Sequence, residues 1–262
     1  MHRQRAKAER FRALHEGEPF VIPNPWDAGS ARVFEALDFP ALATTSSGFA
    51  FTLGRTDGSV TLDEVAEHTA ALDEATDLPV SVDLENGYGD APEDAALAVT
   101  RAAEAGAVGG SIEDYDGSRL YGFEHAVERV TAAVQAARTL PFPFTFTARA
   151  ENHIRGNPDI DDTIERLRAF EAAGADVLYA PGLKTVEEIR RVCEAVTKPV
   201  NVLARPDLTF QEIAGAGGQR VSVGGSLTWT AVDALVTAAE AIRDRGDFSL
   251  LRPSPPLREW FA

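Results

Sequence analysis

The chain has 262 residues, of which 44% are hydrophobic and 25% charged, a composition typical of a globular protein with a large buried core. Its 25 basic and 41 acidic residues give a formal net charge of −16, which disfavours a nucleic acid or an anionic membrane as a partner. The single cysteine, Cys193, excludes an intrachain disulfide and a cysteine-rich zinc site. Because no apolar stretch is long enough to span a bilayer, a cytoplasmic protein is expected.

The chain alternates between short apolar runs and segments of helical periodicity. Residues 1–16 form a basic segment that predicts a solvated helix closing one end of the fold. The eight predicted strands span residues 20–22, 41–45, 79–83, 109–113, 144–148, 176–180, 199–203 and 220–223. Residues from about 247 to 262 are predicted to form a short C-terminal tail.

Several predicted helices have recognisable ends. Thr61 and Thr185 each precede acidic residues, a pattern that caps a helix N-terminus, and Gly106 and Gly174 stand where a glycine C-cap is expected. Eight strand-then-helix units without a dividing linker predict an α/β protein with a single domain, a (β/α)8 TIM barrel with a parallel eight-stranded core. The active site of such a barrel lies where the strands end, so polar groups at those positions are candidate site residues.

Acidic residues gather at the ends of neighbouring predicted strands. Asp83 and Glu85 close the third strand and share one side if that strand stays extended, while Glu113 closes the fourth. Asp57 lies in the loop after the second strand. Carboxylates gathered at one mouth repel one another, and a hard divalent cation with oxygen ligands and water relieves this repulsion. We therefore expect Mg²⁺, with Mn²⁺ as a substitute, although a solvated loop position for Asp57 is an alternative.

Other strand ends offer groups that suit an organic acid. Arg149 closes the fifth strand and can hold a carboxylate bidentately, unless it serves only in a structural salt bridge. The backbone N–H groups of Ser47, Gly48 and Phe49 form a candidate cradle for a carboxylate or oxyanion. Asn201, on the seventh strand, is a further candidate contact to the substrate.

Taken in order, these landmarks resemble the isocitrate lyase / phosphoenolpyruvate mutase superfamily over nearly the whole chain. The landmarks are Asn24-Pro25-Trp26-Asp27, Ser47-Gly48-Phe49, Asp57, residues 83–89, residues 111–114 and Ala148-Arg149-Ala150-Glu151. The resemblance implies a Mg²⁺-dependent enzyme that makes or breaks a C–C or P–C bond beside a 2-oxo acid, through an enolate. It also implies a homo-oligomer, either a tetramer or a dimer.

The resemblance further implies roles for particular residues. Asp83 is expected to bind the metal directly, whereas Asp57, Glu85 and Glu113 hold it largely through water. The backbone of Ser47-Gly48 and the side chain of Arg149 are expected to bind the substrate carboxylate and oxyanion. The same landmarks make Phe49 and Trp26 additional candidate substrate contacts.

The segment after the fourth strand departs from the superfamily pattern. Residues 114–125 lack the Lys-Lys/Arg-Cys-Gly-His sequence whose cysteine is the catalytic acid of the lyases, which disfavours isocitrate and methylisocitrate cleavage by that chemistry. The longer loop of the phosphonate enzymes, with its lysine and asparagine, is also missing. Tyr121 and His125 are therefore the candidate catalytic residues of this loop, beside Arg149.

The sequence thus predicts a Mg²⁺-dependent carbon–carbon lyase. Its expected substrate is a small 2-oxo or 2-hydroxy (di)carboxylate that is cleaved by a retro-aldol reaction or decarboxylated. Two alternatives stay open. One is an enzyme that cleaves a P–C bond, like phosphonopyruvate hydrolase or the mutase, and the other is a non-catalytic protein that binds Mg²⁺ and a 2-oxo acid.

Overall fold

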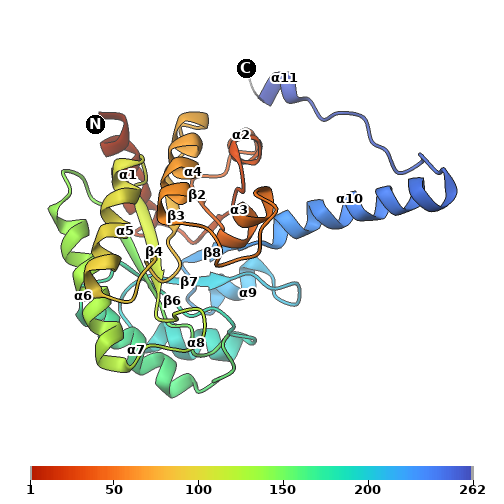
Figure 1. Ribbon diagram of the computed structural model, residues 1–262. Coiled ribbons are helices and arrows are strands. Elements are labelled where there is room, and N and C mark those ends of the chain that lie inside the picture. The colour runs from red at the N-terminus through yellow and green to blue at the C-terminus, as the bar shows by residue number, and fades with distance from the viewer. Residues whose placement is uncertain (1, 261–262) are drawn as a thin grey trace.

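Eight parallel strands surround one core, and the helices ring them on the outside (Figure 1). The computed structural model describes residues 2–260. The strands are β1 (Phe20–Ile22), β2 (Leu42–Ala43), β3 (Val80–Asp83), β4 (Gly109–Glu113), β5 (Thr145–Arg149), β6 (Val177–Tyr179), β7 (Val200–Leu203) and β8 (Arg220–Ser222). They pair in the order β1-β8-β7-β6-β5-β4-β3-β2. A hydrogen bond of 3.1 Å from Ala43 N to Pro23 O nearly closes the ring between β2 and the end of β1.

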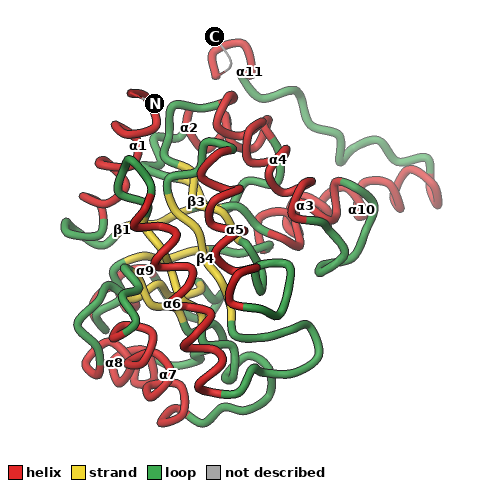
Figure 2. Tube along the Cα trace, turned by 60° about the vertical axis from the view of Figure 1, so that its left-hand side comes forward, coloured by secondary structure: helices red, strands yellow, loops and turns green. Residues whose placement is uncertain are grey.

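The helices follow the strands along the chain, so the predicted (β/α)8 barrel is confirmed (Figure 2). They are α1 (His2–Leu14), α2 (Ala28–Ala36), α3 (Ser46–Thr52), α4 (Leu62–Ala75), α5 (Pro92–Glu104), α6 (Phe123–Thr139), α7 (Ile160–Ala172), α8 (Val186–Ala195), α9 (Phe210–Gly215), α10 (Ser226–Arg245) and α11 (Leu257–Trp260). Within residues 2–260, every helix is too short or too polar to cross a membrane.

The helix ends follow the predicted capping chemistry. Thr61 begins α4 and Thr185 begins α8, each in a capping box with the glutamate three residues later. Gly106 follows α5 at φ 105° and Gly174 follows α7 at φ 101°, a conformation that glycine adopts without steric cost. Local sequence therefore fixes where these helices begin and end.

Helix α1 closes the end of the barrel at which the strands begin, as predicted for the N-terminal segment. Its Phe11 is fully buried and lies directly beneath the first residue of β4, Gly109. Lys7 is also buried, and its Nζ lies 2.6 Å from Asp73 Oδ1 at the end of α4. The opposite end of the barrel is left open for a site.

Most predicted strand bounds differ from the observed ones by one residue, and the second strand differs most. The second strand was expected over residues 41–45 but is restricted to Leu42–Ala43, because Thr45 is the N-cap of α3 and its Oγ1 accepts a hydrogen bond from Gly48 N. The predicted tail at 247–262 contains the short helix α11, and residues 261–262 lie outside the described part of the chain.

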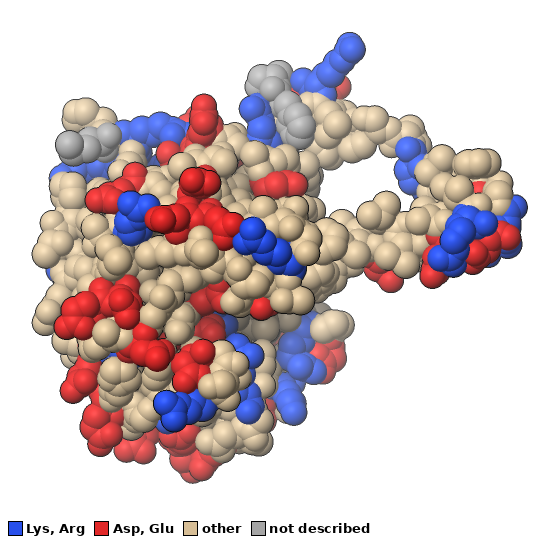
Figure 3. All heavy atoms as spheres, in the orientation of Figure 1, with Lys and Arg blue, Asp and Glu red and all other residues tan. Residues whose placement is uncertain are grey.

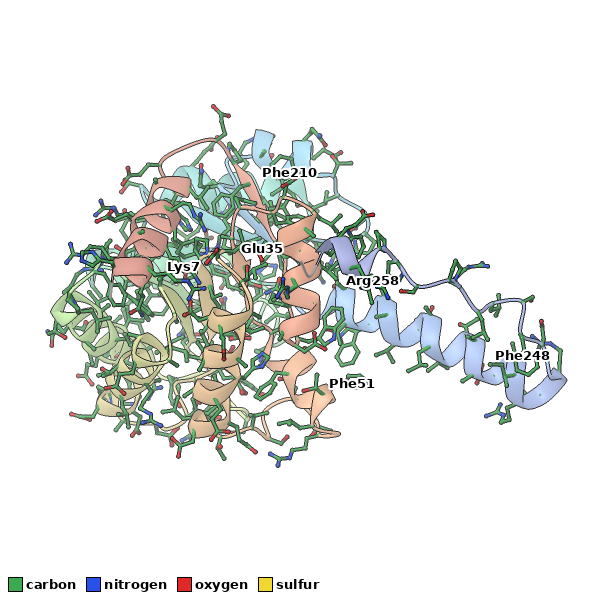
Figure 4. The ribbon with its side chains drawn as sticks, turned by 90° about the horizontal axis from the view of Figure 1, so that it is seen from above. Lys7, Glu35, Phe51, Phe210, Phe248 and Arg258 are labelled. Atoms are coloured by element: carbon green, nitrogen blue, oxygen red, sulfur yellow. The ribbon has the colours of Figure 1, made fainter. Side chains whose placement is uncertain are left out.

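Helix α10 projects away from the barrel and α11 returns to it (Figures 1 and 4). Of the 20 residues of α10, Thr228 and Ala241 are buried. Figure 4 places Phe248 at the far tip of the projection and Arg258 where the chain comes back to the barrel. Helix α11 contacts α2 there.

Candidate active site

The carboxyl ends of β3, β4 and β5 bring one arginine among three carboxylates. Arg149 Nη1 lies 3.1 Å from Asp83 Oδ1, and Arg149 Nη2 lies 3.0 Å from Glu113 Oε2 and 2.8 Å from Glu151 Oε1. All four side chains are at most 15% exposed. Glu113 and Arg149 pair directly across β4 and β5, because parallel strands end at the same edge of a sheet. Strand register therefore assembles this cluster.

The carboxylates keep Arg149 charged. Burial alone would lower its pKa, but Glu151, Glu113 and Asp83 outweigh burial and raise the pKa well above its ordinary value. Burial raises the pKa of Glu113, even though Arg149 and Arg155 both approach its carboxylate. Arg149 is thus a permanent cation whose charge is already shared among three acids.

The chain turns sharply after Asp83, so the predicted extended path to Glu85 is wrong. Glu85 has φ 47°, in the left-handed region, and Gly87 N donates to Leu84 O at 2.7 Å. Glu85 still lies close to Asp83, because its N–H donates to Asp83 Oδ1 at 3.3 Å. Burial, together with the negative charges of Asp83 and Asp57, raises the pKa of Glu85 to about 7. The acids Asp57, Asp83 and Glu85 therefore repel one another at this mouth.

The carboxylates at this mouth suit a hard cation that keeps part of its water shell better than a cation that is enclosed by protein ligands. Within residues 2–260, no group of three or more His, Cys, Asp or Glu side chains could hold a metal ion by itself. Asp83 already accepts hydrogen bonds from Arg149, Glu85 N and Ser46 N. Carboxylate oxygens that act partly through water are the usual ligands of Mg²⁺, and a dication would relieve the repulsion that Glu85 experiences. The arrangement therefore fits one direct carboxylate contact with water-mediated neighbours.

Two chambers open at this end of the barrel. The inner chamber has a volume of about 250 Å³, and its lining includes Ser47, Asp83, Tyr179, Asn201 and Arg220. The outer chamber has a volume of about 900 Å³, and its lining includes Glu85, Tyr88, Glu113, Tyr115 and Asp116. Ser46, Asp57, Arg149 and Arg155 line both chambers. The inner chamber is small enough to select a compact ligand.

The structure brings only some of the predicted substrate contacts to the inner chamber. Ser47 lines it, and so does Asn201, whose Oδ1 accepts from Arg220 and whose Nδ2 donates to Ser222. Gly48, Phe49 and Trp26 do not line this chamber. Thr45 Oγ1 accepts a hydrogen bond from Gly48 N. Phe49 stacks on His68, and Trp26 packs against Phe34. The N–H groups of Gly48 and Phe49 both donate to Thr45, so Ser47 is the member of the predicted cradle that lines the chamber, and the cradle stays a prediction.

The two predicted proton donors also lie outside both chambers. Tyr121 Oη donates to Asp90 Oδ1 at 2.6 Å, and His125 Nε2 lies 2.8 Å from Asp90 O. The loop after β4 folds back on itself through an antiparallel bridge between Tyr115 and Leu120. Because of this bridge, Tyr121 lies on the side of the loop away from the chambers, whereas Tyr115 lines the outer chamber.

Arg155 is the main functional candidate that the sequence did not reveal. Its Nε lies 3.0 Å from Glu151 Oε2 and its Nη2 lies 3.5 Å from Glu113 Oε1. The guanidinium carbon lies 4.1 Å from the ring centre of Tyr115. A second arginine six residues after Arg149 was the available signal, but its pairing depends on the path of the loop after β5.

Asp114, the residue after Glu113, fastens that loop. Its Oδ1 accepts from Glu151 N at 2.7 Å, and its Oδ2 lies 2.9 Å from Arg166 Nη1. These contacts join the ends of β4 and β5 to α7. Asp114 therefore positions Glu151 behind Arg149.

Comparison with known proteins agrees with the fold. A family profile described as phosphoenolpyruvate phosphomutase matches residues 11–243. The chain belongs to this family, within the isocitrate lyase / phosphoenolpyruvate mutase superfamily. A 2-methylisocitrate lyase of Halalkalibacterium halodurans is 31% identical, over 93% of this chain and 84% of that protein. An oxaloacetate decarboxylase of Rhodopseudomonas palustris is also 31% identical, over 89% of this chain and 84% of that protein.

Solved structures support the same placement. A Burkholderia cenocepacia protein provisionally described as a lyase or mutase is 50% identical, with a TM-score of 0.96 over 99% of this chain and 96% of that one. A phosphonopyruvate hydrolase in complex with oxalate and Mg²⁺ shares the fold, with a TM-score of 0.86 and 22% identity over 97% of this chain and 94% of that one. The chain is thus placed among lyases and mutases.

Proposed function

We propose that the protein is a Mg²⁺-dependent lyase that cleaves a C–C bond of a small 2-oxo or 2-hydroxy dicarboxylate through an enolate. The observation that carries this proposal is the group of acids Asp57, Asp83, Glu85 and Glu113 around Arg149, beside a chamber of about 250 Å³. Asp83 would hold the metal directly and the other acids would hold it through water. When bound, the ion would supply Lewis acidity that stabilises the negative charge of an enolate.

The protein's own groups bind and orient the substrate. Arg149, fixed by three carboxylates, would hold the oxo-acid end next to Asp83. In a decarboxylation the C–C bond breaks, CO2 leaves, and the electron pair of the bond enters the enolate. Because Tyr121 and His125 lie outside both chambers, water in the outer chamber is the simplest source of the proton that completes the product.

The proposal is tested with the full-length chain, MgCl2 and a panel of oxaloacetate, 2-methylisocitrate and phosphonopyruvate. Release of pyruvate, CO2 and phosphate is followed, and the rate with Mg²⁺ alone is subtracted. We expect turnover of a C–C substrate, and we expect Asp83→Ala to reduce the rate to background because it removes the direct carboxylate contact. Asp161→Ala, which removes an exposed acid of α7, should keep the wild-type rate.

The possible outcomes separate the three candidate functions. Equal rates for wild type and Asp83→Ala would rule out the lyase proposal. Phosphate release from phosphonopyruvate would favour a P–C bond enzyme. A 2-oxo acid that raises the melting temperature in a Mg²⁺-dependent manner without being consumed would indicate a binding protein.

A further inference from the structure

The chambers contain few positive charges for a ligand with two carboxylates. Among the described residues, the cationic side chains that line them are Arg149, Arg155 and Arg220. Arg149 is committed to three carboxylates. Arg220 is fully buried inside the barrel and donates to Asn201 Oδ1 at 2.8 Å and to Thr147 Oγ1 at 3.0 Å. Arg149 is assigned to the oxo-acid end of the ligand and Arg220 is held by its buried partners, so neither guanidinium is left for a second carboxylate.

Arg155 differs from the other two in exposure and in its bonding. Its side chain is 39% exposed, compared with 14% for Arg149. Its hydrogen bonds to Glu151 and Glu113 use Nε and Nη2, and the contact to Glu113 is long, at 3.5 Å. Within residues 2–260, Nη1 has no hydrogen-bond acceptor in the protein. The guanidinium can therefore donate hydrogen bonds to a ligand while Glu151 holds the Arg155 side chain in place.

The position of Arg155 suits the far end of a short ligand. Arg155 and its neighbour Ile154 line the inner chamber, and Arg155 also reaches the outer one. The face of the Tyr115 ring lies against the guanidinium and favours its charge. The acids of the mouth would repel a second negative charge on the ligand unless a cation met it there.

We propose that Arg155 binds the second carboxylate of a dicarboxylate whose oxo- or hydroxy-acid end lies at Asp83 and Arg149. This inference rests on the proposed function and adds the group that selects the substrate. A planar guanidinium pairs with a carboxylate through two parallel hydrogen bonds, which a methyl group at the same position cannot accept. Arg155 thereby distinguishes dicarboxylates from monocarboxylates of the same length.

The test compares two stable ligands that differ only at the far end, malate and 2-hydroxybutyrate, in which a methyl group replaces the second carboxylate. Their dissociation constants are measured by calorimetry in MgCl2 for wild type and Arg155→Gln. We expect Arg155→Gln to weaken malate binding by about 10- to 100-fold, the usual effect of losing a hydrogen-bonded charge pair, and to leave 2-hydroxybutyrate nearly unchanged. Arg155→Lys should restore part of the malate affinity.

The matched control is Arg190→Gln, which removes an exposed arginine paired with Glu187 on α8. It should leave both dissociation constants unchanged, and circular dichroism confirms that each variant is folded. If Arg155→Gln weakens both ligands equally, Arg155 only orders its loop, and the subsite is wrong while the proposed function stands. If wild type binds neither acid, the subsite is wrong, and the turnover experiment decides the proposed function separately. If the malate preference depends on Arg155 but no substrate is cleaved, the subsite stands and the lyase proposal fails.

Discussion

At the scale of single residues, His15 shows how the closed end of the barrel fixes a protonation state. Its Nδ1 lies 2.9 Å from Phe11 O, which can only accept, and its Nε2 lies 3.2 Å from Arg220 Nη1, which can only donate. The neutral ring with a proton on Nδ1 satisfies both contacts. Burial first, and then the charge of Arg220, lower the pKa of His15 to about 3.

This residue predicts a pH dependence of stability. An unfolded His15 takes up a proton near pH 6.5, whereas the folded one resists protonation down to about pH 3. The stabilisation by neutral His15 is therefore complete above pH 6.5 and is lost as the pH falls toward 3. His15→Gln should remove this loss, so its free energy of unfolding should fall less steeply with acid, by up to about 1.4 kcal/mol per pH unit.

Urea unfolding at pH 7, 6, 5 and 4.5 measures that difference. His2→Gln, which changes an exposed histidine of the same helix, is the control and should keep the wild-type slope. Parallel curves for His15→Gln and wild type would show that His15 is not held neutral by its surroundings.

At the scale of elements, the barrel depends on a close approach between α1 and β4. A Cβ atom on Gly109 would lie 2.7 Å from Phe11 Cε1 and 2.8 Å from Thr145 O on the neighbouring strand. The strand carbonyl cannot move without breaking the sheet. Gly109→Ala should therefore lower the free energy of unfolding by about 1–3 kcal/mol, the usual cost of overpacking.

Gly215→Ala is the matched control, because a Cβ atom at this position would meet nothing within 4 Å. Its stability in urea should equal or slightly exceed that of wild type, since alanine favours a helix more than glycine does. A Gly109→Ala variant as stable as wild type would mean that α1 can shift without cost, and that it does not anchor the strand ends.

The same scale explains which features the sequence could predict. The bounds of β1 and β4 and the caps at Thr61 and Thr185 depend on neighbouring residues, and the prediction of each is confirmed. The barrel follows from repeating that local pattern. Tyr121 was expected to act in catalysis because it lies in the loop that takes the place of the catalytic cysteine loop, but the bridge between Tyr115 and Leu120 turns it away. The position of Tyr121 also depends on its hydrogen bond to Asp90, 31 residues away, which a local pattern does not encode.

Arg155 could not be identified from the sequence for the same reason. Its partners Glu151 and Glu113 come from different strand ends, and only the fold brings them together. The acids Asp83 and Glu113 were easier to find, because both are the last residues of buried strands. Their role as metal ligands stays a prediction that the Asp83→Ala experiment tests.

At the scale of the whole molecule, acidic residues form several patches on the barrel face seen in Figure 3, in keeping with the net charge of −16. Helix α10 and the returning tail project from the barrel, and an open gap separates the two in the same view. Several large apolar side chains are exposed along this part of the chain: Trp229, Leu235, Val236, Phe248, Leu250 and Leu251. Phe51, on α3, packs against Trp229 at the root of α10 (Figure 4).

A second copy of the chain is the partner that best fits this surface, so we expect a homo-oligomer. Unlike the helices after β3 to β7, α10 does not fold back over the barrel, and an isolated helix of this kind gains little stability on its own (Figure 1). Two copies related by a twofold axis would each offer the same apolar helix and the same exposed apolar side chains. One symmetric contact could therefore bury both surfaces.

Light scattering coupled to gel filtration tests this expectation at micromolar concentrations. Wild type should have the mass of a dimer or tetramer, and the double variant Leu235→Glu, Val236→Glu should dissociate, because two charges would be buried without partners in the contact. Leu97→Glu places the same charge on an exposed leucine of α5 and should leave the mass unchanged. A monomeric wild type would contradict the expectation, and so would a double variant that keeps the wild-type mass, since the contact would then lie away from the middle of α10.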